Sequence, residues 1–271
     1  MVNILPQEIM IERLRQICHQ DQRLVAAMLY GSFTYGEADQ FSDIDCVLFF
    51  EDEALAEIDP QAWLSQIAPV EVYFKNEFGN GSAIFSNLVR GEFHFDPASE
   101  MQRLEKLQGS LWFPSLEAVL ILDRTGQLRQ HLQALIGPPP EHDTPQEAGF
   151  QIHSFLNWML FGSNVLARGE MARALELLHI VQDTLLRMAR LLEGSSERWI
   201  TPTRAAEREI SPTAYARLAA CSAKLESRAL WEAYMEAWRW GNELMGGLAA
   251  RHHLELPAGL IEKLDRRLVE R

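Results

Sequence analysis

The distribution of apolar and polar residues divides the chain into a mixed first part and a helical second part. In the first part, short apolar runs bounded by turn residues alternate with stretches of helical periodicity, which is typical of a sheet covered by helices. The predicted helices are residues 7–20 and 60–67, and the predicted strands are residues 24–30, 43–50, 70–74, 83–88, 91–95 and 118–122. We therefore expect an α/β region whose sheet holds about five of these strands.

In the second part, apolar residues recur at helical spacing almost to the end of the chain. The predicted helices are residues 144–168, 170–193, 211–226, 229–252 and 257–269. Gly169 is expected to end the first of them, because glycine tolerates the left-handed conformation that commonly follows a helix. Large apolar residues at this spacing, such as Trp238, Trp240 and Met188, are expected to form the core of a helical bundle.

The change of pattern coincides with a proline-rich segment. Pro138–Pro140 cannot lie inside a helix, and consecutive prolines favour a stiff, extended linker. The predicted domains are therefore residues 1–137 and residues 144–271, with residues 138–143 joining them. We expect the first domain to contain a mixed sheet and the second to be all-α.

The charge distribution narrows the range of functions. The 271 residues carry a formal net charge of −13, and residues 1–143 account for all of it, with 22 acidic and 9 basic side chains. Binding to a nucleic-acid backbone requires a basic surface, so the composition argues against nucleic acid as a partner. An acidic first domain suits a metal-dependent site or a cationic small substrate.

Cysteine content and hydropathy indicate the cellular setting. Cys18, Cys46 and Cys221 are widely spaced and form no CxxC pair, which favours reduced cysteines in a cytoplasmic protein. No apolar run approaches the roughly 20 residues of a membrane span. The first residues lack the basic start and apolar block of a signal peptide. We therefore expect a cytoplasmic protein with no membrane partner.

One stretch carries the pattern of a phosphate and metal site. A predicted strand ends at Gly31-Ser32, and the next one opens with Asp43 and Asp45. Alternate residues of a strand share a face, so the two carboxylates are expected on the same side. Carboxylate oxygens suit Mg²⁺, which binds one or two protein carboxylates together with substrate phosphates. The backbone N–H groups and hydroxyl of Gly31-Ser32 can hold phosphate oxygens. Together these residues predict a nucleoside-triphosphate site.

Gly-Ser followed by Asp-x-Asp resembles the signature of the DNA polymerase β-like nucleotidyltransferases. Within them, the chain is most similar to the lincosamide nucleotidyltransferases, in particular to their larger, two-domain branch. The segments that carry this likeness span almost the whole chain: residues 30–34, 36–37, 42–44, 75–77, 87–88, 90–95, 125–128 and 168–170. Two residues depart from the pattern: Asp45 stands where relatives can carry Glu, and Glu71 stands where an apolar residue is expected.

The resemblance implies a fold and a reaction. The fold is a polymerase-β-like nucleotidyltransferase domain followed by a helical bundle domain. The reaction is transfer of a nucleoside monophosphate, with ATP as the expected donor, to a hydroxyl of lincomycin or clindamycin, with release of pyrophosphate. The family needs Mg²⁺, here two ions bridged by Asp43 and Asp45, and works as a homodimer whose helical domain helps to bind the drug.

The attacking hydroxyl needs a base, and Glu92 is the predicted one. Strand alternation places Glu92 and His94 on one face of residues 91–95, and the resemblance implies the same catalytic role for Glu92, which is also the expected third carboxylate at the metal. His94 is a possible assistant, and Glu71 is the rival for Glu92. Lys75 and Arg90 are the predicted clamps of the triphosphate in this acidic domain.

Two alternative functions stay open. An aminoglycoside nucleotidyltransferase would use the same catalytic residues, and its polycationic substrate would suit the net charge of −13. A non-catalytic, antitoxin-like interaction module would not require the intact Gly-Ser, both aspartates and a base. The sequence does not fix the nucleotide base, since no residue stands out as one that distinguishes adenine from guanine.

Overall fold

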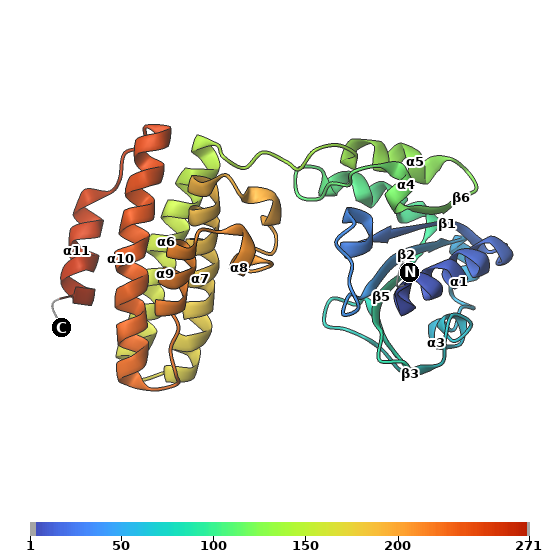
Figure 1. Ribbon diagram of the computed structural model, residues 1–271, viewed down its shortest axis with the longest axis horizontal. Helices are drawn as coiled ribbons and strands as arrows, with labels where there is room; N and C mark the ends of the chain where they lie inside the picture. Colours follow the sequence, from blue (N-terminus) through green and yellow to red (C-terminus); the bar gives the residue numbers. More distant parts are fainter. Residues whose placement is uncertain (1–3, 270–271) are drawn as a thin grey trace. The chain divides into compact units, whose positions relative to one another are not determined.

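The computed structural model describes residues 4–269 and divides into two compact units between Pro140 and Glu141 (Figure 1). The division falls inside the proline-rich segment at 138–143 that the sequence marks as the linker. No helix within residues 4–269 combines the length and the apolar character that crossing a membrane requires.

The first unit is built on one sheet, which has six strands in the described part of the chain. They are β1 (Leu24–Tyr30), β2 (Ile44–Phe50), β3 (Val70–Lys75), β4 (Gly81–Phe85), β5 (Arg90–Pro97) and β6 (Leu120–Asp123). Their order is β3-β4-β5-β2-β1-β6; β2 and β5 are parallel, and the other neighbouring pairs are antiparallel. The predicted mixed sheet is confirmed.

Helices cover both faces of this sheet. The helices of the first unit are α1 (Pro6–Gln20), α2 (Asp52–Leu55), α3 (Pro60–Leu64), α4 (Leu116–Val119) and α5 (Gln127–Leu132), with the 3₁₀ helices η1 (Ser32–Tyr35), η2 (Ala98–Leu107) and η3 (Gln133–Leu135). Leu29 and Cys46 pack on the face of α1 and α3, whereas Met28 and Val47 pack on the face of η2 and α5. Because β1 and β2 are buried on both faces, their residues are apolar apart from Asp45 near the start of β2.

The predicted strand 91–95 is observed as the longer Arg90–Pro97, and two other predicted strands are shifted along the chain. The strand expected at 118–122 begins only at Leu120, because the Ser115 hydroxyl accepts a hydrogen bond from the Ala118 N–H and starts the short helix α4. The strand expected at 83–88 lies at Gly81–Phe85. Residues after Phe85 turn back toward β5, with Leu88 in the left-handed region at φ 65°. Hydrogen bonds at a helix start and the turn at Leu88, rather than the positions of apolar residues, therefore set the ends of these two strands.

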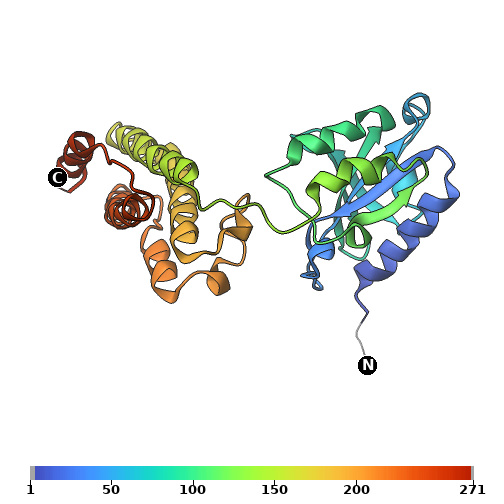
Figure 2. The ribbon, with the colours of Figure 1, turned by 90° about the horizontal axis from the view of Figure 1, so that it is seen from above.

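The second unit is helical, as predicted. Its elements are α6 (Pro145–Ala167), α7 (Met171–Glu193), η4 (Ser196–Arg198), α8 (Ala206–Glu209), α9 (Pro212–Ala220), α10 (Ser227–His252) and α11 (Ala258–Val269). Figure 2 looks nearly along α10, which packs against α6, α7, α9 and α11. The predicted helix 211–226 is wrong over residues 221–226, since α9 ends at Ala220. The separate short helix α8 was not predicted.

The core of the second unit contains the predicted tryptophan and methionine residues. Trp238 and Met188 are fully buried, and the Trp238 ring stacks on Phe155 with ring centroids 6.0 Å apart. Gly169 has φ 83° between α6 and α7, so it ends α6 in the left-handed conformation that the sequence suggested.

Candidate active site

The turn that follows β1 depends on the backbone conformation of Gly31. Gly31 has φ 73° and ψ −157°, a conformation that is essentially restricted to glycine. A Cβ atom at this position would lie 2.2 Å from Oδ2 of Asp45. The chain then enters η1 at Ser32, and the Thr34 hydroxyl donates a hydrogen bond of 2.7 Å to the Gly31 carbonyl oxygen. The absence of a side chain at Gly31 therefore allows the Asp45 carboxylate to lie directly against the Gly-Ser turn.

Asp45 lies at the centre of the site because of the strand register. It is the register partner of Tyr30 on β1 and of Glu92 on β5. Asp43 directly precedes β2, and 37% of its side chain is accessible. The structure thus brings Asp43, Asp45 and Glu92 together with Gly31. They lie at one end of the central strands, where β1 ends and β2 and β5 begin.

Glu92 is held by hydrogen bonds from neighbouring strands and turns. Its Oε1 accepts a hydrogen bond of 3.0 Å from the Asn80 side-chain amide and one of 3.4 Å from the Tyr30 hydroxyl. The same oxygen lies 3.4 Å from Nε2 of His94, and the Tyr30 hydroxyl lies 2.9 Å from that nitrogen. The buried Phe93 faces the opposite side, which agrees with the predicted alternation. These contacts fix one carboxylate oxygen of Glu92.

Arg90 links two of the carboxylates. Its guanidinium donates a hydrogen bond to Asp43 and lies 3.5 Å from Oε2 of Glu92. Partial burial would lower the pKa of Arg90, but the hydrogen bond to Asp43 and the negative charges of Asp43, Glu92 and Asp45 raise it above its usual value. The positive charge of Arg90 therefore offsets the repulsion between carboxylates at this position.

Tyr30 and Asn80 belong to the site although the sequence analysis did not select them. Burial, together with the negative charges of Asp45 and Glu92, raises the pKa of Tyr30 strongly, so its hydroxyl remains a hydrogen-bond donor. Tyr30 directly precedes Gly31, and Asn80 ends the turn before β4. The position beside the Gly-Ser turn was a usable signal for Tyr30. No feature of the sequence pointed to Asn80, because its contact with Glu92 depends on how β4 pairs with β5.

Gln7 is a third residue that sequence reasoning missed. It is buried in α1, and its side-chain amide donates hydrogen bonds to the carbonyl oxygens of Gln40 and Ser42, at 3.1 and 2.9 Å. Gln7 therefore fixes the loop that leads into Asp43.

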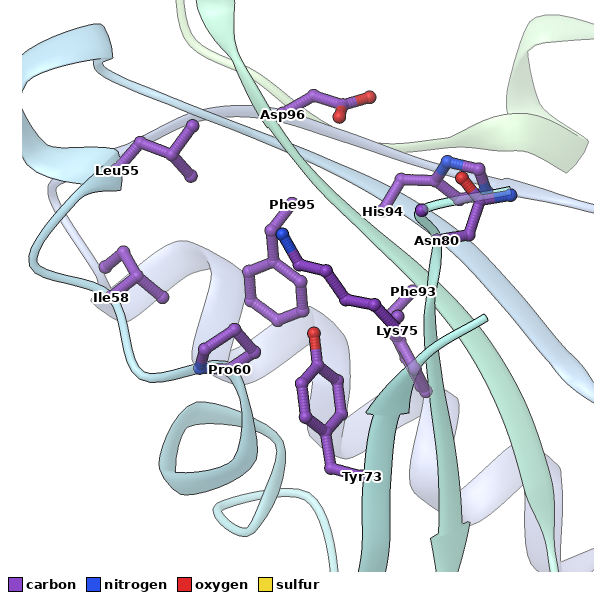
Figure 3. Close-up of a pocket in the computed structure, with 12 residues that line it drawn as sticks. Leu55, Ile58, Pro60, Tyr73, Lys75, Asn80, Phe93, His94, Phe95 and Asp96 are labelled. Atoms are coloured by element: carbon purple, nitrogen blue, oxygen red, sulfur yellow. The ribbon is translucent and has the colours of Figure 1, made fainter. Parts of the chain in front are cut away.

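The structure does not bring Lys75 and Glu71 to these carboxylates. Both lie on β3, the edge strand, with β4 and β5 between it and β2. At about 4.8 Å per strand, β3 and β1 are about 19 Å apart. One phosphate group cannot contact both Lys75 and Ser32 over that separation. Lys75 instead lines a pocket of about 320 Å³ beside Asn80 and His94 (Figure 3).

The donor set of the site suits a hard divalent cation. In the described range 4–269, no group of three or more His, Cys, Asp or Glu side chains is gathered closely enough to hold a metal ion by itself. Mg²⁺ is commonly bound by one or two protein carboxylates, with substrate phosphates and water completing its ligands. Asp43 and Asp45 beside the Gly31-Ser32 turn fit that requirement. The metal roles given to Asp43, Asp45 and Glu92 stay predictions.

Two known protein families match this chain, one in each of its two units. Residues 11–108 match the family described as nucleotidyltransferase domain, and residues 144–267 match the family described as lincosamide nucleotidyltransferase-like, C-terminal domain. A search of curated proteins finds no match.

Two similar solved structures span most of the chain. An aminoglycoside 6-adenyltransferase from Bacillus subtilis is 16% identical, with 96% of this chain and 95% of that chain covered and a TM-score of 0.44. A nucleotidyltransferase-like protein from Exiguobacterium sibiricum is 15% identical, with 89% and 77% covered and a TM-score of 0.39. Both TM-scores are too low to relate these proteins to the site of this chain.

Proposed function

We propose that this chain, a nucleotidyltransferase whose second unit belongs to the lincosamide nucleotidyltransferase-like family, transfers AMP from ATP to a hydroxyl of a lincosamide antibiotic and so inactivates it. The observation that carries the proposal is the position of Asp45. It is the register partner of Glu92 and lies against Gly31, inside the segment that matches the nucleotidyltransferase domain. A phosphate-binding turn, a metal-binding carboxylate and a base thus share one site.

The metal in this proposal is Mg²⁺. The family resemblance implies that the reaction requires a nucleoside triphosphate and a divalent metal. We propose that Asp43 and Asp45 hold two Mg²⁺ ions, with Glu92 as a further candidate ligand. When bound, the ions supply charge stabilisation for the attacking and leaving oxygens.

The residues of the chain have separate tasks in the reaction. Ser32 and the backbone N–H groups of the Gly31-Ser32 turn bind the phosphates that leave as pyrophosphate. Arg90, which contacts Asp43 and Glu92, is the proposed clamp of the triphosphate. Glu92 takes the proton of the acceptor hydroxyl, whose oxygen then forms the bond to the α-phosphorus. The bond from that phosphorus to the bridging oxygen breaks, and pyrophosphate keeps the electron pair.

Hydrogen bonds from Asn80 and Tyr30 orient Glu92 for this step. Both reach Oε1, so Oε2 is the oxygen that faces Arg90 and the reacting groups. A base held in one orientation is effective because proton transfer requires hydrogen-bond distance to the acceptor hydroxyl.

Mass spectrometry of lincomycin and clindamycin tests the function directly. Each drug is incubated with the pure protein, ATP and Mg²⁺, and the expected product is the drug with one added AMP. EDTA and the Asp45→Asn variant are the controls, and both should abolish the product. Unmodified drug in the complete reaction would contradict the lincosamide assignment.

A specific observation also supports an aminoglycoside acceptor. All the excess negative charge lies in residues 1–143, which would attract a polycation. Kanamycin is therefore included as a parallel substrate. An AMP adduct on kanamycin alone would replace the lincosamide by an aminoglycoside and leave the nucleotidyl transfer unchanged.

We also propose that the enzyme acts in the cytoplasm as a homodimer, as the family resemblance implies. All three cysteines are buried and reduced, which suits the cytoplasm. Light scattering coupled to size-exclusion chromatography tests the dimer, and a mass near that of one chain, 30.9 kDa, would contradict it.

A further inference from the structure

Arg90 lies on the same face of the sheet as the candidate carboxylates. Ile44 is the register partner of Gly91, so the residues that precede them, Asp43 and Arg90, are neighbours where β2 and β5 begin. Arg90 and Glu92 are alternate residues of β5 and therefore share a face. Gly91 allows β5 to approach β2 closely, since a Cβ atom there would lie 2.8 Å from the Ile44 carbonyl oxygen. The strand register thus places the guanidinium of Arg90 among the carboxylates.

The guanidinium acts as a counter-ion to all three carboxylates. Its Nη1 donates a hydrogen bond to Oδ2 of Asp43, and its Nη2 lies 3.5 Å from Oε2 of Glu92. Asp45 also interacts with it through its negative charge. A cation that belongs to the chain therefore lies where Asp43 and Asp45 are proposed to hold Mg²⁺.

Arg90 and a divalent cation compete for Asp43. Mg²⁺ binds a carboxylate oxygen at about 2.0–2.1 Å and carries two positive charges. The guanidinium is already in hydrogen-bond contact with Oδ2 of this carboxylate. Two cations at one carboxylate repel each other, whichever of the two oxygens each of them contacts. Arg90 is therefore expected to weaken the binding of a metal ion that arrives without a nucleotide.

The side chain of Arg90, rather than the loop of Asp43, is the part that moves when a metal ion binds. Gln7 is buried and holds this loop through the carbonyl oxygens of Gln40 and Ser42. The side chain of Arg90 is 46% exposed, so it can turn toward solvent while its backbone stays in β5. Asp43 thus keeps its position, and the guanidinium is displaced.

A triphosphate offers the displaced guanidinium a new partner. Guanidinium groups bind phosphate oxygens through paired, charge-assisted hydrogen bonds. In the proposed function the phosphates lie over the Gly31-Ser32 turn, which is in contact with Asp45, a residue within the electrostatic range of Arg90. The triphosphate therefore draws the competitor away from Asp43, and a metal ion at Asp43 releases Arg90 for the phosphates. By linkage, each ligand then raises the affinity for the other.

We propose that Arg90 couples metal binding to nucleotide binding: it holds the Asp43 carboxylate until a nucleoside triphosphate binds the guanidinium and a divalent cation replaces it at Asp43. The inference rests on the proposed nucleotidyl transfer and gives Arg90 a second task besides clamping the triphosphate. A metal ion alone binds weakly to such a site, and metal and nucleotide bind as a pair.

Two binding titrations test the coupling without any turnover. Mn²⁺, a paramagnetic substitute for Mg²⁺, is titrated without nucleotide and followed by electron paramagnetic resonance. Arg90→Gln is expected to bind Mn²⁺ about tenfold more tightly than the wild type, within the usual range of coupling energies. The same variant should bind α,β-methylene-ATP, titrated calorimetrically in saturating Mg²⁺, about tenfold more weakly. Damage to the fold would weaken both ligands, so changes of opposite sign identify the coupling.

Two further variants separate the position of the charge from its presence. Arg90→Lys keeps a cation beside Asp43 and should keep the Mn²⁺ affinity close to that of the wild type. Arg103→Gln removes an arginine of the same unit that is paired with Asp96 and Glu100 instead. It lowers the net positive charge by the same amount and should leave both affinities within about twofold of the wild type.

The outcomes for the coupling and for the proposed function are distinct. An unchanged or weaker Mn²⁺ affinity in Arg90→Gln would overturn the coupling, even if lincomycin or kanamycin receives AMP. A wild-type Mn²⁺ affinity that α,β-methylene-ATP does not raise would overturn it as well. If neither antibiotic is modified, the proposed substrate fails, and the two titrations still decide the role of Arg90.

Discussion

The contact between Gly31 and Asp45 gives a prediction that separates backbone strain from loss of catalysis. In Gly31→Ala, the new Cβ would lie 2.2 Å from Oδ2 of Asp45. Ordinary contact distances begin near 3.4 Å, so the carboxylate must move by about 1 Å. A displacement of this size at a reacting centre costs about 100-fold in rate. We therefore expect kcat/KM to fall about 100-fold.

The same substitution also strains the backbone. The conformation of Gly31, φ 73° and ψ −157°, costs a residue with a side chain about 1–3 kcal/mol. For a unit of this size, that corresponds to a decrease of roughly 3–12 °C in Tm. Calorimetry gives the Tm, and nucleotidyl transfer to lincomycin gives kcat/KM.

Gly36→Ala is the matched control. Gly36 has φ 68° and ψ 23°, which also disfavours a side chain, but an added Cβ meets no atom within 4 Å. We expect its Tm to fall by a few degrees, in line with a backbone cost of about 1–2 kcal/mol, and its kcat/KM to stay within twofold of wild type. If Gly31→Ala lost stability but kept its kcat/KM, the contact with Asp45 would have no role in catalysis.

Three further predictions concern the carboxylates and one buried arginine. Asp43→Asn and Asp45→Asn should each abolish turnover while the circular dichroism spectrum stays that of the wild type, and normal turnover in either would refute its metal role. Glu92→Gln should bind Mg²⁺-ATP with nearly unchanged affinity in calorimetric titration but lose about 100- to 10,000-fold in kcat, as expected for a general base; an unchanged kcat would remove Glu92 from that role. Arg190 is fully buried and donates to Glu209 and three backbone carbonyls, so Arg190→Met should destabilise the second unit by about 3–5 kcal/mol in denaturant unfolding. A loss below about 1 kcal/mol would mean that the surrounding loop repacks.

Much of the fold was predictable because its central elements have clear patterns. β1 was predicted at its observed bounds because its residues are apolar and Gly31 ends the run. The parallel pairing of β2 with β5 was not predictable from periodicity, since the two strands are separated by the chain that forms α2, α3, β3 and β4.

The site was predictable only as far as its residues follow one another in the sequence. Gly31-Ser32 and the two aspartates form a compact motif, and Glu92 was reached through alternation and family resemblance. Lys75 lies near Glu92 in the sequence, but the sheet order puts it on the edge strand β3. Local spacing could not reveal this separation.

The crossover between β2 and β5 has a consequence for how such enzymes diversify. Residues 51–89 begin and end at the strands that carry Asp45 and Glu92, and they contain most of the lining of the pocket of about 320 Å³, including Leu55, Ile58 and Lys75. The aspartates and Glu92 lie outside this stretch. Substitutions among residues 55–75 can therefore reshape that pocket while the sequence that positions the three carboxylates stays unchanged.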